Sequence, residues 1–311
     1  MRERLKALRE AAAQVADVAA KTTSTKATST TATPGKIEPG LAGSLRAVRR
    51  QLADEKLAQA PGFAGRVAVV AITRHAITLA GKVVAALPDA RRHVPEKFLA
   101  EAERCAPGAV VAYAGKTGDE LGRLFGAVDG IVAIFSLGAL VRLIAPHLKS
   151  KETDPAVVVL DEEGRFAIPM LSGHLGGANA LAGRLAVALD ATPVLTTASD
   201  VRETLAVDLL GRELGWALDA THEALVHASA AVVNDEPVAL VQETGSPDWW
   251  TRHANGRRGP LPANLTRFDR LEDVDPARYA AVLIVTQRAL PANYADALAG
   301  RCVICRPQED A

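Results

Sequence analysis

Short apolar runs alternate with stretches of helical periodicity along the chain from Arg66 onward. β-Branched runs of this length are typical of strands buried on both faces of a sheet, and the intervening stretches repeat apolar residues every three to four positions. Strands are expected at 67–73, 110–114 and 130–137, and helices at 77–87, 119–128 and 139–148. This alternation predicts βαβ units, and therefore an α/β fold with a mostly parallel sheet flanked by helices.

The pattern changes between residues 156 and 215. Two strand-like runs, 156–160 and 165–171, flank an acidic turn that contains Gly164, which predicts a β-hairpin. A helix is expected at 180–189 and a strand at 192–197. Asp200 and Glu203 have the spacing of a capping box, which predicts a helix that begins there and reaches Gly215.

The chain is expected to form three regions: 1–65, 66–215 and 216–311. The first combines a short amphipathic helix with a Thr/Ser-rich linker, whose composition cannot bury enough apolar surface to fold. The second holds the main sheet. The third is a smaller α/β domain with a helix at 223–235, a loop containing Trp249 and Trp250, and strands at 237–243, 265–269, 280–286 and 302–307.

Composition narrows the class of protein. The 311 residues are 49% hydrophobic and carry 36 basic and 36 acidic side chains, so there is no basic excess to attract nucleic acid, and aromatic residues are only 4%. The most apolar stretch, 131–141, is shorter than a membrane span, and the N-terminus lacks the apolar core of a signal peptide. Three cysteines in a chain of this length favour a reducing compartment, and we expect a cytoplasmic protein.

The stretch SGHLGGAN, residues 172–179, holds the strongest candidate site. Gly173, Gly176 and Gly177 let the backbone approach a ligand closely, and a loop that enters a helix presents N–H groups to an anion. It matches neither of the common glycine-rich nucleotide motifs. The alternative is a tight strand-to-helix turn in which Asn179 caps the helix. Binding is favoured because open α/β sheets hold ligands at the carboxyl ends of their strands.

Several polar residues are candidates to complete this site. His174 has the intrinsic pKa of a general acid or base, and Ser172 can donate a hydrogen bond or act as a nucleophile. Arg142 follows an apolar run and can clamp an acidic substrate, although a solvent-exposed helix arginine is an equal alternative. Thr196, Thr197 and Asp200 stand at the end of a predicted strand, with Asp200 as a simple helix cap the competing interpretation.

No metal or cofactor site held by the protein is expected. The spacing of Cys302 and Cys305 resembles a metal-binding pair, but in a strand these two thiols point to opposite faces. The seven histidines show none of the spacings of known metal motifs.

The sequence resembles the cobalt-precorrin-5A hydrolases of anaerobic cobalamin biosynthesis. The resemblance covers about residues 66–300 and is carried by VAVVAITRHAITLAGKV, HVPEKF, the block from LGALVRLIAPHLKS to SGHLGGANALAGRLA, TPVLTTASDV, VVNDEPVALVQE, LPANLTRF and YAAVLIVTQRALP. It implies hydrolysis of the ring A lactone of a cobalt corrinoid, with release of acetaldehyde. It also implies that cobalt arrives with the substrate. The family's third, C-terminal domain has no counterpart here, so we expect either a separate chain that supplies it or a partnership with other enzymes of the pathway.

The roles of individual residues follow from chemistry and not from the resemblance. His174, or a water that it activates, is expected to promote attack on the lactone carbonyl. The glycine N–H groups are expected to stabilise the oxyanion, and Ser172 and Asn179 to orient the substrate. Two alternatives remain open. The first is a corrinoid-binding subunit without activity, or a paralogue that needs a separate chain for the C-terminal domain. The second is an unrelated α/β module that binds a nucleotide or an organic acid.

Overall fold

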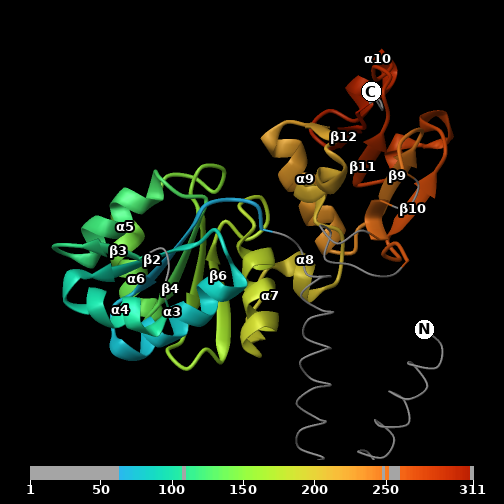
Figure 1. Cartoon of the computed structure of the whole chain (residues 1–311). Coiled ribbons are helices and arrows are strands. Elements are labelled where there is room, and N and C mark those ends of the chain that lie inside the picture. Colours follow the sequence, from blue (N-terminus) through green and yellow to red (C-terminus); the bar gives the residue numbers. More distant parts are fainter. Residues whose placement is uncertain (1–62, 107–109, 247–248, 252–259, 309–311) are drawn as a thin grey trace, which may run out of the picture. The chain divides into compact units, whose positions relative to one another are not determined.

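The computed structural model describes residues 63–106, 110–246, 249–251 and 260–308 (Figure 1). By its contacts the chain divides into residues 1–48 and 49–311, and all the described residues belong to the second unit. The helix and linker predicted in the first 62 residues therefore lie outside the described part of the chain. The described part contains two mostly parallel sheets flanked by helices, which confirms the α/β prediction.

The first sheet has seven strands in the order β3-β2-β1-β4-β5-β6-β7. Every neighbouring pair is parallel except β5 and β6, which are antiparallel. The strands are β1 (Val67–Ala71), β2 (Arg91–Pro95), β3 (Val110–Tyr113), β4 (Gly130–Ile134), β5 (Ala156–Leu160), β6 (Phe166–Leu171) and β7 (Thr192–Pro193). The helices are α3 (Arg74–Ala86), α4 (Leu99–Cys105), α5 (Thr117–Phe125), α6 (Leu137–Ile144) and α7 (Ala178–Leu189).

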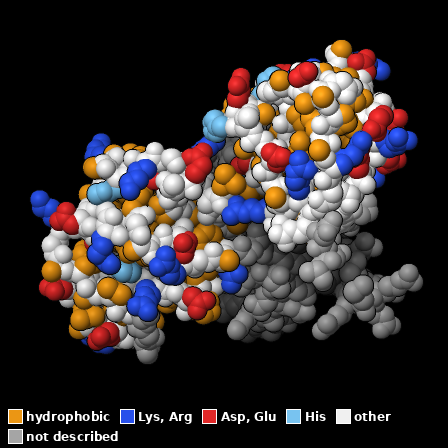
Figure 2. Space-filling model, turned by 90° about the horizontal axis from the view of Figure 1, so that it is seen from above, with side chains coloured by type: hydrophobic (Ala, Val, Ile, Leu, Met, Phe, Trp, Pro, Cys, Tyr) orange, Lys and Arg blue, Asp and Glu red, His pale blue; other side chains and the backbone are white. Residues whose placement is uncertain are grey.

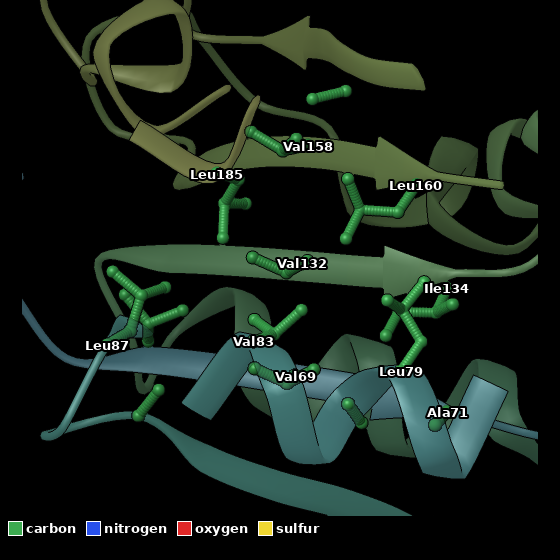
Figure 3. Close-up of a cluster of buried hydrophobic side chains, with 14 of the residues drawn as sticks. Val69, Ala71, Leu79, Val83, Leu87, Val132, Ile134, Val158, Leu160 and Leu185 are labelled. Atoms are coloured by element: carbon green, nitrogen blue, oxygen red, sulfur yellow. The ribbon is translucent and has the colours of Figure 1, made fainter. Parts of the chain in front are cut away.

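Helices cover both faces of this sheet, which explains why its strands are continuous apolar runs. Val69, Val132 and Val158 point to the face packed by α3, α4 and α7, where they form one hydrophobic cluster (Figure 3). The alternate strand residues, such as Val70 and Ala133, point to the opposite face, which α5 and α6 cover. Because both faces are buried, polar chemistry can occur only in the loops at the two edges of the sheet where its strands begin and end.

The reversed strand β6 decides at which edge the glycine-rich loop lies. In the β5–β6 register Leu160 pairs with Ala167, while Leu171, the last residue of β6, pairs with Val157 near the start of β5. The loop after β6 therefore lies at the edge where β1 to β5 begin. Gly177 in this loop lies against Phe63, which precedes β1. The strands β6 and β7 thus bring their carboxyl ends to the edge opposite the carboxyl ends of β1 to β5.

The second sheet has five strands in the order β10-β9-β11-β12-β8, all parallel except the edge pair β12–β8. The elements are β8 (Ala217–Asp219), α9 (His222–Val233), β9 (Val238–Gln242), β10 (Leu265–Phe268), β11 (Ala281–Val285), α10 (Ala292–Ala297) and β12 (Cys302–Arg306). One face packs on α9 and Trp249, and the other on Leu271, Val274 and Leu298. The predicted second α/β domain is confirmed as an architecture. The boundaries at residues 65 and 215 remain predictions.

The helix predicted from Asp200 to Gly215 is wrong. Only a short helix, α8 (Ala198–Val201), forms, followed by the 3₁₀ turns η3 (Val207–Leu209) and η4 (Arg212–Leu214). Glu203 adopts a left-handed conformation with φ of 51°, which ends the helical path where the capping box should have begun it. Leu205 and Val207 instead bury their side chains in the core of the second sheet.

On the face shown in Figure 2, acidic and basic side chains are interspersed and form no single basic patch. Within the described ranges, no helix is long and apolar enough to cross a bilayer.

Candidate functional site

The glycine-rich loop, residues 172–177, folds around the start of α7 and uses the first amides of the helix itself. The N–H groups of residues 177–179 donate to the carbonyls of His174, Ser172 and Gly173 at 2.9–3.1 Å. The helix donors that the sequence suggested for an anion are therefore occupied by the loop. The amides of residues 173–176 donate no hydrogen bond within the described part of the chain, and they are the donors left for a ligand.

The loop needs glycine for two separate reasons. A Cβ atom on Gly176 would lie 2.3 Å from the Cβ of Ser172, and one on Gly173 would lie 2.8 Å from Oδ1 of Asn179, closer than real atoms approach. Gly177 is the N-cap of α7 with φ of 86°, a left-handed conformation that costs a side-chain-bearing residue energy. The three glycines thus fix the shape of the loop, whatever it binds.

His174 has a carboxylate at each of its ring nitrogens. Nδ1 lies 3.1 and 3.2 Å from the two oxygens of Asp208, and Nε2 lies 3.3 Å from Oδ2 of Asp200 and 3.1 Å from Oγ of Ser199. The hydrogen bonds to Asp200 and Asp208 raise the pKa of His174 to about 9, against the opposing effect of burial. At neutral pH the ring is an imidazolium that donates from both nitrogens, so it has no free lone pair with which to accept a proton.

Asp200 is held in place by Asn179 and is not a helix cap. The Asn179 amide donates to Oδ2 of Asp200 at 2.8 Å and to Oγ1 of Thr197 at 2.9 Å. The N-cap of α8 is Thr197, and Asp200 lies inside that short helix. Both simpler interpretations, Asp200 as a cap of its own helix and Asn179 as a cap of α7, are therefore wrong. Thr196 is exposed beside this group.

The serine that contacts His174 is Ser199 and not Ser172. Ser172 has a φ of 54°, and its hydroxyl donates to the carbonyl of Asp154 at 2.8 Å, which ties the loop to the segment before β5. Ser199 is almost completely buried, and its Oγ accepts from the protonated ring. Neither hydroxyl faces a neutral histidine that could remove its proton, as a nucleophilic serine requires.

Arg142 is not brought to this cluster. It lies in α6, which begins at the carboxyl end of β4, and its Nη1 donates to the carbonyl of Gly138 in the first turn of that helix. The glycine-rich loop lies at the other edge of the sheet, about one five-residue strand away, or roughly 16 Å. Arg142 is exposed to solvent, as in the alternative drawn from the sequence.

Three polar residues near the loop were missed by sequence reasoning: Ser199, Asp208 and Arg212. The Arg212 guanidinium donates through Nη1 to the carbonyl of Leu175, inside the glycine-rich loop, at 2.6 Å. Asp208 and Arg212 lie within the wrongly predicted helix, and Ser199 lies directly before it. No local motif marks them, because their contacts with the loop join positions 25 to 37 residues apart.

The cysteine pair is unsuited to metal or redox chemistry. Cys305 packs in the cluster on one face of the second sheet and Cys302 in the cluster on the other, as their spacing predicts. Burial raises the pKa of each thiol to about 12, so neither is a thiolate at neutral pH. Among the described residues, no group of three or more His, Cys, Asp or Glu side chains is arranged to hold a metal ion.

A second polar cluster lies where β9 and β11 end. Glu243 accepts from Nε and Nη2 of Arg288 at 2.8 and 2.5 Å and from the Thr286 hydroxyl at 2.7 Å. These contacts lower the pKa of Glu243 to about 2, and the hydrogen bonds from Arg288 have the largest effect. Arg288 also pairs with Glu272 at 2.8 Å, so the charges of this cluster are satisfied among its own members.

Together these features define a two-sheet α/β protein with a partly exposed polar loop, a half-buried cationic histidine and unoccupied backbone donors. The family model described as Cobalamin synthesis G N-terminal matches residues 119–200, and the one described as Cobalamin biosynthesis central region matches residues 205–307. The chain belongs to this cobalamin synthesis G family. His174 lies in the first matched region and Asp208 in the second.

Two curated relatives carry the same name. The chain is 40% identical to the cobalt-precorrin-5A hydrolase of Priestia megaterium over 78% of its own length and 63% of that protein. It is 32% identical to the cobalt-precorrin-5A hydrolase of Salmonella typhimurium over 59% of its own length and 48% of that protein. The chain thus spans between about half and two thirds of the length of these relatives.

Proposed function

We propose that this chain acts as a cobalt-precorrin-5A hydrolase, which opens the ring A lactone of a cobalt corrinoid and releases acetaldehyde. The observation that carries the proposal is the 40% identity with the Priestia megaterium relative of that name, across most of this chain. The cobalt is part of the substrate in this proposal, and the protein supplies binding groups and acid–base groups.

The reaction requires two bond cleavages. Water adds to the lactone carbonyl, and the ester C–O bond breaks to give a carboxylate and a hydroxyl on the two-carbon fragment. That hydroxyl then becomes a carbonyl as the carbon–carbon bond to the macrocycle breaks. The bonding electron pair and a proton pass to the macrocycle carbon, and acetaldehyde leaves. Such a path needs a group that accepts a proton from water and donors that stabilise the oxyanion.

We assign proton acceptance to Asp200, because a His174 with a pKa of about 9 is protonated at neutral pH. Asn179, which also donates to Thr197, orients the Asp200 carboxylate, and Ser172 holds the loop through Asp154. The His174 imidazolium forms an ion pair with each of the carboxylates of Asp200 and Asp208. Its Nε2–H is shared between two acceptors at 3.1 and 3.3 Å, which leaves room for a substrate oxygen as a competing acceptor.

The oxyanion is stabilised in this proposal by the loop amides of residues 173–176, which include Gly173 and Gly176. Gly177 acts through its left-handed backbone and not through its N–H, which donates to the carbonyl of His174. Thr196, exposed at the end of the following segment, is available for contact with the macrocycle.

The purified protein incubated with cobalt-precorrin-5A tests the proposal, with acetaldehyde and the corrinoid product measured together. We expect one acetaldehyde per corrinoid converted. Asp200→Asn should lower the rate by about a hundred-fold or more, as the loss of a general base does. Asp235→Asn is the matched control, because Asp235 is an exposed aspartate paired with Arg202 on the surface.

Two results would contradict parts of the proposal. Corrinoid binding without acetaldehyde release would favour a carrier subunit over an enzyme. Full acetaldehyde release by both His174→Ala and Asp200→Asn would show that the reaction does not take place at this loop.

A further inference from the structure

Arg212 is held rigidly beside the glycine-rich loop. It begins the 3₁₀ turn η4 after Gly211, whose φ is 67°. A Cβ atom on Gly211 would lie 2.3 Å from the ring of Trp216, and Trp216 packs against the core of the second sheet. The backbone of Arg212 is therefore fixed by a tight packing contact, and its guanidinium reaches the carbonyl of Leu175 at 2.6 Å.

The guanidinium of Arg212 has no ionic partner among the described side chains. The side chain is exposed. By contrast, Arg202 pairs with Asp235 and Arg288 pairs with Glu243. An arginine has five N–H donors, and within the described part of the chain only one of the two on Nη1 is engaged, so an edge of the planar group is left for a bidentate contact.

The surroundings of Arg212 suit an anion with an apolar body. The free amides of residues 173–176 lie in the same loop as the carbonyl that Arg212 contacts. Leu175 and Val201, the neighbours of His174 and Asp200 in sequence, are 36% and 66% exposed. Two exposed aliphatic side chains beside free polar donors are what a flat macrocycle with acidic side chains would contact.

We propose that Arg212 anchors a carboxylate of the corrinoid substrate, with the free edge of its guanidinium on an acetate or propionate side chain while Leu175 and Val201 contact the ring. This inference rests on the proposed function for the identity of the macrocycle. Arg212 acts as a binding residue and sets specificity for corrinoids whose side chains are still free acids.

Comparing two corrinoids of similar size distinguishes the effect of ligand charge on binding from that of ligand shape. Cobyrinic acid carries free carboxylates, whereas the side chains of cobinamide are amides. Binding is measured by ultrafiltration and the visible absorbance of the corrinoid. We expect the wild-type protein to bind cobyrinic acid more tightly than cobinamide. Arg212→Gln should weaken cobyrinic acid binding about ten-fold or more, the effect of losing one charge-assisted hydrogen bond, and leave cobinamide binding unchanged. Arg212→Lys should give an intermediate affinity for cobyrinic acid, because lysine keeps the positive charge but lacks the planar group that donates two parallel hydrogen bonds.

Arg104→Gln is the matched control. Arg104 is also exposed, also donates to a backbone carbonyl, and forms no ion pair among the described residues, but it lies on α4. Equal affinity of wild type and Arg212→Gln for cobyrinic acid overturns the anchor, and so does an equal loss for both corrinoids or a wild type that binds neither. A charge-selective loss in a protein that releases no acetaldehyde from cobalt-precorrin-5A would support the anchor and refute the proposed activity.

Discussion

Nδ1 of His174 lies 3.1 Å from Oδ1 of Asp208, a residue 34 positions later in the chain. With Asp200 at the other ring nitrogen, this contact makes His174 a cation whose charge is stabilised by the fold. The two aspartates lie on either side of residues 201–204, the short segment between the two family regions. The protonation of one loop histidine is thus tied to how that segment folds.

The first prediction concerns stability at alkaline pH. The pKa of His174 is about 9 in the folded protein and about 6.5 in the unfolded chain. The resulting stabilisation is fully present below pH 6.5 and is lost as the pH rises through about 9, by up to about 3 kcal/mol. Urea unfolding at intervals from pH 6 to pH 10 should show this decline in the wild type and a flatter profile in His174→Gln.

An NMR titration of the His174 Cε1 proton gives the same pKa directly. We expect a midpoint near 9, and a lower one in Asp208→Asn, because that variant keeps the shape of the side chain and removes its charge. Parallel pH profiles for wild type and His174→Gln, or an unchanged midpoint in Asp208→Asn, would refute the ionic pairing.

The second prediction separates two glycines close together in sequence. Gly176→Ala should destabilise the protein by about 1–3 kcal/mol, because the new Cβ would overlap Ser172. Gly183→Ala should stabilise it by about 0.5–1 kcal/mol, since Gly183 lies within α7 and nothing lies within 4 Å of the added atom. Thermal unfolding of both variants measures this, and a shift of the same sign in both would contradict it.

The third prediction concerns acid stability and Glu243. Its pKa is lowered to about 2, so its stabilising contribution is present above about pH 4.5 and is lost as the pH falls through about 2. Glu243→Gln should lower the free energy of unfolding at pH 7 by roughly 1–2 kcal/mol, discounted because Arg288 is 43% exposed. The difference from wild type should vanish near pH 2. A difference that is constant with pH would show that shape, not charge, is responsible.

The fourth prediction concerns the three cysteines. Cys105 is exposed, whereas burial raises the pKa of Cys302 and Cys305 to about 12. Iodoacetamide at pH 8 should therefore alkylate Cys105 in the native protein and modify the other two only after denaturation. Peptide mass spectrometry gives the answer, and early modification of Cys302 or Cys305 in the native protein would contradict their burial.

The sequence predicted most readily the strands that are buried on both faces of a sheet. The runs at 130–137 and 156–160 were recognisable because burial on both sides demands continuous hydrophobicity. Strand β2, with the sequence RRHVP, was missed for the same reason. Its Arg92 is buried with its guanidinium donating to the carbonyls of Ala102 and Ala106, and Nδ1 of its His93 donates to the Glu120 carboxylate at 2.6 Å. These hydrogen bonds allow polar side chains to be buried in the strand, so its sequence shows no hydrophobic pattern.

The candidate site was only partly predictable for a related reason. His174, Asn179, Thr197 and Asp200 were identified because they cluster in sequence near glycines, and the structure brings them together. Asp208 and Arg212 reach the loop through tertiary contacts, and the edge at which the loop lies depends on the antiparallel pairing of β6. The sequence singled out Arg142, which lies at the other edge of the sheet, and gave no sign of the contact that Arg212 makes with the loop.

The direction of β6 also gives the first sheet two ends that can be changed independently. The helices that follow β1 and β4 begin at one end, after Thr73 and Ser136. His174 and the two aspartates beside it lie at the other end. A fluorescent label or an affinity tether attached near Ser136 would therefore stand a strand's length from His174. Binding of a corrinoid could then be followed by energy transfer without altering any group that the reaction is proposed to use.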